Sequence, residues 1–457
     1  MKNYQSINPY TGEFLKDFDC RSSDEIEVIL SKGLTVFSEW RKTSFEQRKM
    51  VILSLAALLE KQEKRLSHLI VTEMGKPITE ARAEIKKCAS LCLYYAEHSE
   101  EFLISRKHDN VNYKAEVVFQ PIGIILTIMP WNFPFWQVFR VLIPIIMVGN
   151  VGLLKHAPNV PQCALAIEKL ILEAGFPVGG FQNLFLTNTA IAKIIADNRI
   201  KGVTLTGSDK AGSIIAMEAG KNIKKVVLEL GGNDPFIVLE DANIEQAVDK
   251  LIDSRFMNAG QTCIAAKRLI LSESIKDIFL TELKKKIPLK IRQGNPLDEK
   301  TTITILARKD LKESLATQVD ILLDKGGHVL FKMKCVEHEN AFPIMLIDVS
   351  AVSSKDRDIE LFGPVLQILN FRNEEELVEI ANDTSYGLGA SIWSENIRKA
   401  NSLALDLDVG GVYINEMEFS DPSLPFGGTK KSGIGRELAI EGLKEFVNVK
   451  TIFVQQG

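Results

Sequence analysis

Two residue types in this chain could together carry out an oxidation by covalent catalysis. Cys263 lies in the stretch GQTCIA (260–265), and Glu229 follows an apolar run just before Gly231 and Gly232. A thiolate can attack an aldehyde carbon, and a carboxylate can later deprotonate the water that hydrolyses the resulting thioester. Taken singly, Cys263 could also be a buried apolar residue, and Glu229 could also be a surface carboxylate at a strand end.

Each member of this pair needs an environment that makes it reactive. A free thiol titrates near pH ~8.5, so an attacking cysteine needs backbone amides or a helix terminus that favour the thiolate. Gly260 would let such amides approach the sulfur of Cys263 and the oxyanion that its attack creates. Because two glycines follow soon after Glu229, we expect its carboxylate to protrude into a cleft.

Three further motifs could complete such a site. Asn132, in PWNFP (130–134), could donate its side-chain amide to an oxyanion together with the backbone amide of Cys263. TLTGS (204–208) predicts a strand, a turn and a helix start, where exposed amides favour a phosphate. Lys155 ends an apolar run and could hydrogen-bond to ribose hydroxyls. The alternatives are an Asx turn, a plain capped turn and a surface lysine, respectively.

Composition bounds the class of protein. With 457 residues, 46% of them hydrophobic, the chain is long enough for about three domains of roughly 150 residues. Its 55 basic and 59 acidic residues are mixed, so no net field favours nucleic acid or an anionic membrane. The apolar stretches 122–130 and 141–154 are broken by Gly or Pro and too short for a membrane span.

Cysteine and histidine usage points to a reducing compartment without a metal site. Six cysteines are too sparse for a disulfide framework, and the polar start of the sequence has no signal-peptide pattern. We therefore expect a cytoplasmic protein. The cysteines and histidines show no ligand spacing, so we expect no metal.

The order of predicted elements indicates an α/β protein. Residues 24–103 form a helical region, with a capping box at Ser44, that we expect to carry little chemistry. Strands at 122–128, 151–155, 202–206 and 225–228 then alternate with helices at 161–174, 190–196 and 210–219. This alternation is typical of an open parallel sheet whose ligands gather at the carboxyl ends of its strands. A second alternation, from 236 to about 407, contains predicted strands at 269–271, 341–347 and 365–371.

Seven motifs in this order resemble those of the aldehyde dehydrogenase superfamily: PWNFP, LLKHAP, TLTGS, LELGGNDPF, GQTCIAAKR, ELFGPV and LPFGGTKKSGIGRE. The resemblance runs from about Asn8 to Val454. It implies that Cys263 is the nucleophile, that Glu229 activates water for deacylation, and that Asn132 with the Cys263 amide forms the oxyanion hole.

The resemblance also implies a nicotinamide cofactor, NAD or NADP. Lys155 would hold the adenosine ribose, Glu360 would hold the nicotinamide ribose, and Phe362 would brace the nicotinamide ring. Gly207 and Ser208 would hold the pyrophosphate. The full set of implied cofactor-binding residues is Trp131, Lys155, Thr206, Gly207, Ser208, Glu360 and Phe362. No carboxylate follows Lys155 where many relatives have one, so a 2′-phosphate is not repelled and both cofactors stay open.

The fold implied by the resemblance is α/β, with two open-sheet domains and a small β-arm. A cofactor-binding domain would comprise 1–104 and 122–230, and a catalytic domain would comprise 231–431. An oligomerisation arm would comprise 105–121 and 436–457. A partner subunit can cover the unpaired edges of such an arm, so we expect a homodimer or a homotetramer.

Within the superfamily, PWNFPFWQVFR, LLKHAPNVPQCA and FSDPSLPFGG are similar to bacterial succinate-semialdehyde dehydrogenases. Arg140 follows Asn132 by about two helical turns and could clamp the distal carboxylate of a semialdehyde. Ser420 could add a hydroxyl. The alternatives are a surface or inter-subunit salt bridge for Arg140 and a turn-forming role for Ser420.

Other functions could use part of this set. A cysteine hydrolase needs a base such as histidine beside the nucleophile, and none accompanies Cys263; a coenzyme A-acylating dehydrogenase would not need Glu229 as a base. Another short aliphatic aldehyde or semialdehyde stays open as the substrate. A catalytically silent relative with the same fold also stays open, although the intact motif residues argue against it.

Overall fold

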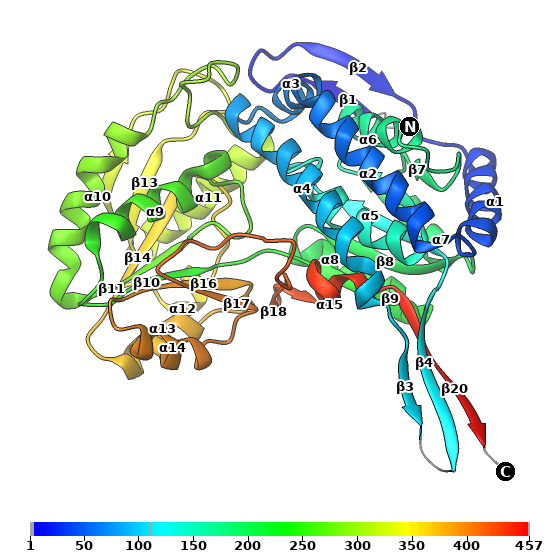
Figure 1. Cartoon of the computed structure of the whole chain (residues 1–457). Coiled ribbons are helices and arrows are strands. Elements are labelled where there is room, and N and C mark those ends of the chain that lie inside the picture. The colour runs from blue at the N-terminus through cyan, green and yellow to red at the C-terminus, as the bar shows by residue number, and fades with distance from the viewer. Residues whose placement is uncertain (1–3, 110–111, 456–457) are drawn as a thin grey trace.

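Two lobes and a projecting arm make up the chain (Figure 1). The computed structural model describes residues 4–109 and 112–455. Each lobe is built around an open sheet with helices, which confirms the α/β fold class that the sequence predicted. No helix in the described ranges is long and apolar enough to cross a membrane.

The first lobe contains a six-stranded sheet with the order β19-β9-β8-β5-β6-β7. The strands from β9 to β7 are parallel, and β19 is antiparallel to β9. The strand bounds are β5 Ile124–Met129, β6 Val151–His156, β7 Phe181–Asn183, β8 Ile200–Thr206, β9 Lys225–Glu229 and β19 Gly433–Ile434. β5, β6, β8 and β9 confirm the strands predicted from apolar runs.

Helices connect these strands and cover the sheet. The connecting helices are α5 Trp136–Val148, α6 Pro161–Glu173, α7 Asn188–Ala196 and α8 Asp209–Lys221. The preceding helices are α1 Ser23–Trp40, α2 Phe45–Lys61, α3 Glu63–Met74 and α4 Ile78–Phe102. The capping box predicted at Ser44 is present, because its hydroxyl and the Gln47 side chain each accept the other residue's backbone N–H. An N-terminal hairpin, β1 Tyr4–Ile7 and β2 Phe14–Phe18, was not predicted.

The second lobe contains a seven-stranded sheet with the order β12-β13-β14-β11-β10-β16-β17. Only β12 runs antiparallel to its neighbour. The strand bounds are β10 Pro235–Val238, β11 Arg268–Ser272, β12 His328–Met333, β13 Ile344–Asp348, β14 Val365–Phe371, β16 Gly389–Trp393 and β17 Gly411–Ile414. The predicted strands correspond to β11, β13 and β14; the sequence did not resolve the other four.

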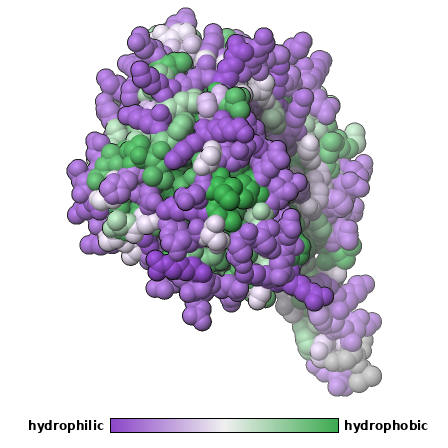
Figure 2. Space-filling view, turned by 90° about the vertical axis from the view of Figure 1, so that its left-hand side faces the viewer, coloured by the Kyte–Doolittle hydropathy of each residue, from purple (hydrophilic) through white to green (hydrophobic). Residues whose placement is uncertain are grey.

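Helices on this second sheet and a few short elements complete the lobe. The helices are α9 Ile244–Phe256, α10 Lys276–Lys290, α11 Lys309–Asp324, α12 Ser354–Arg357, α13 Glu374–Asn382 and α14 Ile397–Leu405. The short elements are η1 Met257–Gly260, η2 Glu273–Ile275, β15 Tyr386–Gly387 and β18 Thr429–Lys430. The short helix α15 Ala439–Lys444 packs instead on α4 and α5 of the first lobe. The lobe's outer face is mostly hydrophilic with separate apolar areas (Figure 2).

The arm is a three-stranded antiparallel sheet with the order β20-β4-β3. Its strands are β3 Arg106–Asp109, β4 Tyr113–Pro121 and β20 Val447–Gln455. The expected pairing between the 105–121 region and the C-terminal segment is therefore present. After Val447 every residue of β20 is exposed, and the arm points away from both lobes (Figure 1).

A buried ion pair positions the start of α5, the helix that follows the Asn132 turn. Glu84 of α4 accepts the backbone N–H groups of Phe135 and Trp136 through Oε1, at 2.8 and 3.0 Å. Its Oε2 accepts from Lys76 Nζ at 2.6 Å, and both side chains are almost completely buried. The same carboxylate thus joins a lysine to the first turn of α5.

Replacing Lys76 with Met should lower the free energy of unfolding by about 3–5 kcal/mol, because the mutation leaves the Glu84 carboxylate buried without its counter-charge. Urea denaturation measures this loss. Lys42→Met is the control, because Lys42 pairs with Glu39 at an exposed site and should contribute less than about 1 kcal/mol. Equal effects of the two substitutions would contradict the role assigned to Lys76.

Candidate active site

Cys263 lies where two pockets meet. Pocket A, of about 980 Å³, has a lining that includes Trp131, Asn132, Thr206, Gly207, Ser208, Cys263, Arg308, Glu360 and Phe362. Pocket B, of about 700 Å³, has a lining that includes Glu80, Glu84, Lys87, Trp136, Arg140, Cys263, Ser420 and Phe426. Because Cys263 lines both, molecules bound in the two pockets would meet at its side chain.

A strained turn leads into Cys263. α9 ends at Phe256, and Asn258, Ala259 and Gly260 then all have positive φ values of 54°, 54° and 74°. At Gly260 a Cβ would collide with the carbonyl oxygen of Gly363, so only glycine permits this close approach. Gly260 thus allows contact with the 360–363 segment, whereas its expected role of letting amides approach the Cys263 sulfur stays a prediction. Left-handed residues in succession are costly and persist only where surrounding contacts hold them.

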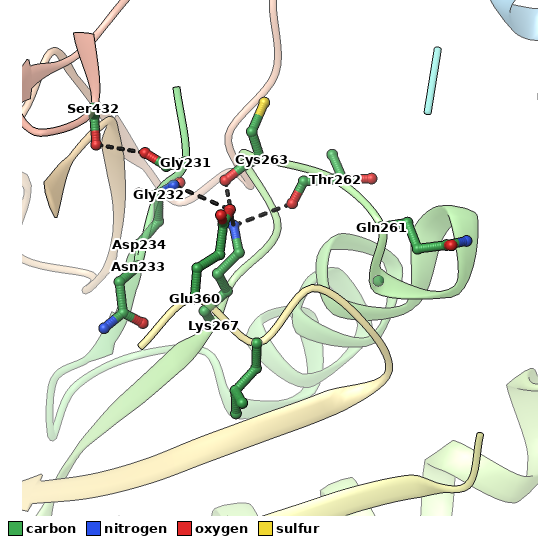
Figure 3. A network of polar contacts seen from close by, with 12 residues as sticks. Gly231, Gly232, Asn233, Asp234, Gln261, Thr262, Cys263, Lys267, Glu360 and Ser432 are labelled. Carbon is green, nitrogen blue, oxygen red and sulfur yellow. Dashed lines mark hydrogen bonds and ion pairs between the residues drawn. The ribbon is translucent and has the colours of Figure 1, made fainter. Parts of the chain in front are cut away.

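Lys267 supplies such contacts. Its Nζ donates to the carbonyl oxygen of Thr262 at 3.1 Å and to that of Cys263, and forms an ion pair with Glu360 at 3.3 Å. Figure 3 shows the Cys263 carbonyl turned toward Lys267, while the thiol points away from this network. Sequence analysis missed Lys267, although it stands in the same motif, four residues after the cysteine.

This anchoring also orients the Cys263 amide. The Thr262 carbonyl and the Cys263 N–H belong to one peptide unit, and in a trans peptide they point in opposite directions. With the carbonyl held by Lys267, the N–H is directed away from that lysine. An amide fixed in this way is suited to donate to an oxyanion without rearrangement.

The Cys263 side chain is partly buried, and this burial raises the pKa of its thiol to about 12, although the positive charges of Arg140 and Lys267 act in the opposite direction. Burial thus opposes the thiolate in this conformation, and its expected stabilisation by local amides stays a prediction. Desolvation outweighs the favourable charges, so the thiol is neutral at physiological pH. Attack on an electrophile consequently requires removal of this proton.

Glu229 is the last residue of β9, and its position corrects the expectation of a carboxylate that protrudes into a cleft. The side chain is buried and lines neither pocket A nor pocket B. Its Oε1 lies beside the backbone of Gly427, where a Cβ would be 2.5 Å away. Neither carboxylate oxygen has a hydrogen-bond partner in the described part of the chain. Burial and repulsion by Glu437 raise its pKa well above the usual range.

Asn132 is fixed beside the nucleophile turn. Its side-chain Nδ2 donates to the carbonyl oxygen of Gln261 at 3.0 Å, and its own carbonyl accepts from Asn258 Nδ2 at 2.9 Å. Asn132 also lines pocket A with Cys263. The structure thus brings the predicted amide donor and the cysteine together through the intervening backbone.

Pocket A gathers six of the seven predicted cofactor residues. The rings of Trp131 and Phe362 meet edge to face, with centroids 6.0 Å apart. Ser208 caps α8 by accepting the backbone N–H of Ala211 at 3.3 Å, so the amino end of this helix opens beside the pocket. Glu360 accepts the backbone N–H of Gly232 at 3.1 Å.

These groups fit a dinucleotide: apolar rings for a flat base, a carboxylate for ribose hydroxyls and a helix start for phosphate.

Lys155 does not line pocket A; it is buried at the end of β6, where burial lowers its pKa. Arg308 was missed by sequence analysis, and its guanidinium lies 5.7 Å from the Trp131 ring.

In pocket B, Arg140 makes a buried ion pair with Glu437. Its guanidinium also lies 4.5 Å from the Phe426 ring, and its Nη2 atom has no hydrogen-bond partner among the residues described. The alternative of a surface or inter-subunit salt bridge is wrong, because the pair is internal and almost completely buried. Ser420 also lines the pocket, where it accepts a hydrogen bond from Lys87 at 2.7 Å. Lys87 comes from the helical region 24–103, for which the sequence predicted little chemistry, and the structure places it at this pocket.

The raised pKa of Cys263 predicts how its alkylation depends on pH. The rate with iodoacetamide should rise about tenfold per pH unit between pH 7 and 10, because the thiolate fraction keeps increasing below a pKa of about 12. Mass spectrometry of the Cys263 peptide measures this rate. The same peptide in urea-unfolded protein is the control, and its rate should level off above pH ~8.5. A native profile that levels off below pH 9 would contradict the desolvated thiol.

Comparison with known proteins agrees with this geometry. The Aldehyde dehydrogenase family matches residues 1–452. The chain is 42% identical to the probable succinate-semialdehyde dehydrogenase [NADP(+)] of Synechocystis sp., covering 98% of this chain and 99% of that protein. It is 41% identical to the succinate semialdehyde dehydrogenase [NAD(P)+] Sad of Escherichia coli, covering 98% and 97%. The structure of succinic semialdehyde dehydrogenase from Streptococcus pyogenes with NADP+ is similar at a TM-score of 0.96 and 38% identity, covering 99% and 100%. The chain belongs to the aldehyde dehydrogenase family.

Proposed function

We propose that this protein oxidises succinate semialdehyde to succinate, with NAD or NADP as the electron acceptor. The single observation that carries the proposal is that Cys263 lines both pocket A and pocket B. One pocket offers groups suited to a dinucleotide, and the other offers cationic groups suited to a carboxylate. The names of the relatives from Synechocystis and Escherichia coli support the same substrate and both cofactors.

In the proposed mechanism, Cys263 attacks the aldehyde carbon from the junction of the pockets. The proton of the thiol must leave first, because burial keeps it neutral at rest. Asn132 and the Cys263 amide donate to the oxyanion of the resulting thiohemiacetal. Loss of hydride from that carbon leaves a thioester on the sulfur. Water activated by Glu229 then hydrolyses the thioester and releases succinate.

Glu229 must rotate toward Cys263 to act in this last step. The carboxylate has no hydrogen bond that holds it in its buried position, so rotation breaks none. Its raised pKa also suits a base that accepts a proton from water and later releases it. We propose that the Gly427 backbone leaves the room for this movement, since a side chain there would contact the carboxylate.

The proposed cofactor residues are those of pocket A together with Lys155. The nicotinamide of NAD or NADP, when bound, supplies the acceptor for the hydride. Phe362 would brace the ring and Trp131 would line the site beside it. Glu360 and Lys155 would bind the two riboses, and Thr206, Gly207 and Ser208 would line the phosphate-binding part of the pocket. His156 adds no positive charge for a 2′-phosphate, because burial lowers its pKa to about 4 and its Nε2 contacts the Pro134 carbonyl.

The quaternary structure remains part of the proposal. β20 exposes Val449, Ile452, Phe453 and Val454 on the projecting arm, which a second copy of the chain could cover. We propose a homodimer or a homotetramer on this basis. The cytoplasmic location stays a prediction from the sequence.

Purified protein should reduce NADP or NAD when succinate semialdehyde is added, which absorbance of the reduced cofactor measures. Cys263→Ala should abolish this reduction. Glu229→Gln should release about one equivalent of reduced cofactor per subunit in a rapid burst, then turn over about 10²- to 10⁴-fold more slowly, because the thioester forms but water is not activated.

Other outcomes would select other functions. If the Glu229→Gln variant showed no burst and turned over at the wild-type rate, Glu229 would not be the base that hydrolyses the thioester. Reduction with butanal and other short aldehydes, but not with succinate semialdehyde, would favour a different aldehyde substrate. No reduction with any short aldehyde would favour the catalytically silent alternative.

A further inference from the structure

Lys87 is a cation in pocket B that neither the sequence motifs nor the mechanism uses. It projects from α4, and its Nζ donates to Ser420 Oγ at 2.7 Å. The ammonium also lies 4.4 Å from the centroid of the Trp136 ring. The hydroxyl and the ring hold the charge beside the cavity that contains the Cys263 side chain.

The two cations of pocket B differ in their counter-charges. Arg140 has Glu437 as a buried ion-pair partner. No carboxylate lies within ion-pair distance of Lys87 in the part of the chain that the structure describes. An uncompensated, partly desolvated ammonium attracts an anion more strongly than a guanidinium already neutralised by a carboxylate.

The acidic side chains of the pocket are engaged elsewhere. Glu84 accepts from Lys76 and from two backbone amides of α5. Glu80 accepts the backbone N–H of Asn258 at 2.9 Å, and burial raises its pKa to about 7. Neither carboxylate therefore forms an ion pair with Lys87, which lines the same pocket as the nucleophile.

We propose that Lys87 supplies the charge that selects an aldehyde with a distal carboxylate, while Arg140 contributes a directional hydrogen bond through Nη2. The inference rests on the proposed oxidation of succinate semialdehyde and names the residue that determines its specificity. Lys87 thus takes the role that we expected for Arg140, the cation that attracts the distal carboxylate of the substrate. Ser420, which accepts from Lys87 in this structure, holds the ammonium in place.

This assignment implies a pH dependence. Burial, followed by the like charge of Arg140, lowers the pKa of Lys87 to about 8, while Glu84 of the same helix and Asp421 of the facing loop act in the opposite direction. The ammonium is charged below that pH and loses its charge as the pH rises through it. The preference for the acid-bearing aldehyde should therefore fall above pH 8.

The test compares kcat/KM for succinate semialdehyde and for butanal, at saturating NADP and from pH 6.5 to 9.5, in wild type, Lys87→Met and Lys87→Arg. Lys87→Met should lower the preference for succinate semialdehyde about 10- to 100-fold, mainly through KM, because one charged hydrogen bond is lost. Lys87→Arg should keep much of the preference and remove its decline near pH 8, because arginine stays charged. Lys86→Met is the matched control, since Lys86 is the exposed neighbour on the same helix, and should match wild type.

Each contrary outcome has a distinct meaning. A Lys87→Met enzyme that keeps the wild-type preference would overturn the inference, as would equal losses on both substrates. A decline near pH 8 that persists in Lys87→Arg would overturn the titration of Lys87. A wild-type enzyme that oxidises butanal but shows no preference for succinate semialdehyde would instead overturn the proposed substrate.

Discussion

The fixed orientation of the Cys263 turn is the constraint on which the rest of the site depends. Lys267 holds the carbonyl groups of Thr262 and Cys263 on one side, so the thiol and the Cys263 amide face the other. The same ammonium pairs with Glu360, which lines pocket A. One buried lysine therefore fixes the positions of the nucleophile turn and of Glu360, the proposed ribose-binding carboxylate, relative to each other. The two come from different parts of the second lobe.

Burial has the largest effect on the pKa values of the two catalytic candidates, Cys263 and Glu229. It raises the pKa of Cys263 to about 12 and that of Glu229 well above the usual range, so the resting site disfavours negative charge on either group. Negative charge then has to develop during the reaction, on the sulfur and on the substrate oxygen. Arg140 and Lys267 favour that charge, and amides positioned in advance stabilise it without the cost of reorganising water. The apolar surroundings that disfavour the resting thiolate thus also strengthen the interactions made by the oxyanion.

Much of the fold and the site was predictable because it depends on local pattern. The short apolar runs of β5, β6, β8 and β9, alternating with helical stretches, predicted a parallel sheet, and the TLTGS motif predicted the hydroxyl cap of α8. β10 and β17 have only four residues each, which is too short for a clear periodic signal. β12 lies at a sheet edge with exposed residues, so its sequence lacks a buried apolar run.

Side-chain orientation and long-range pairing were not predictable. The sequence placed Glu229 at a strand end but gave no sign that its carboxylate turns toward Gly427. It suggested Arg140 from helical spacing, but the partner Glu437 is distant in the chain and reaches it only through tertiary packing. Lys87 was not predicted as a site residue, because nothing local shows that its ammonium meets Ser420. Such contacts depend on how α4, α5 and the C-terminal loops pack together.

The most direct test of the central claim is to identify the covalent intermediate by mass spectrometry. The Glu229→Gln enzyme is mixed with NADP and succinate semialdehyde, quenched in acid and digested. A succinyl thioester is expected on the peptide that contains Cys263, at close to one per subunit. Reduced cofactor without any acylated cysteine, or acylation of a different cysteine, would contradict covalent catalysis by Cys263.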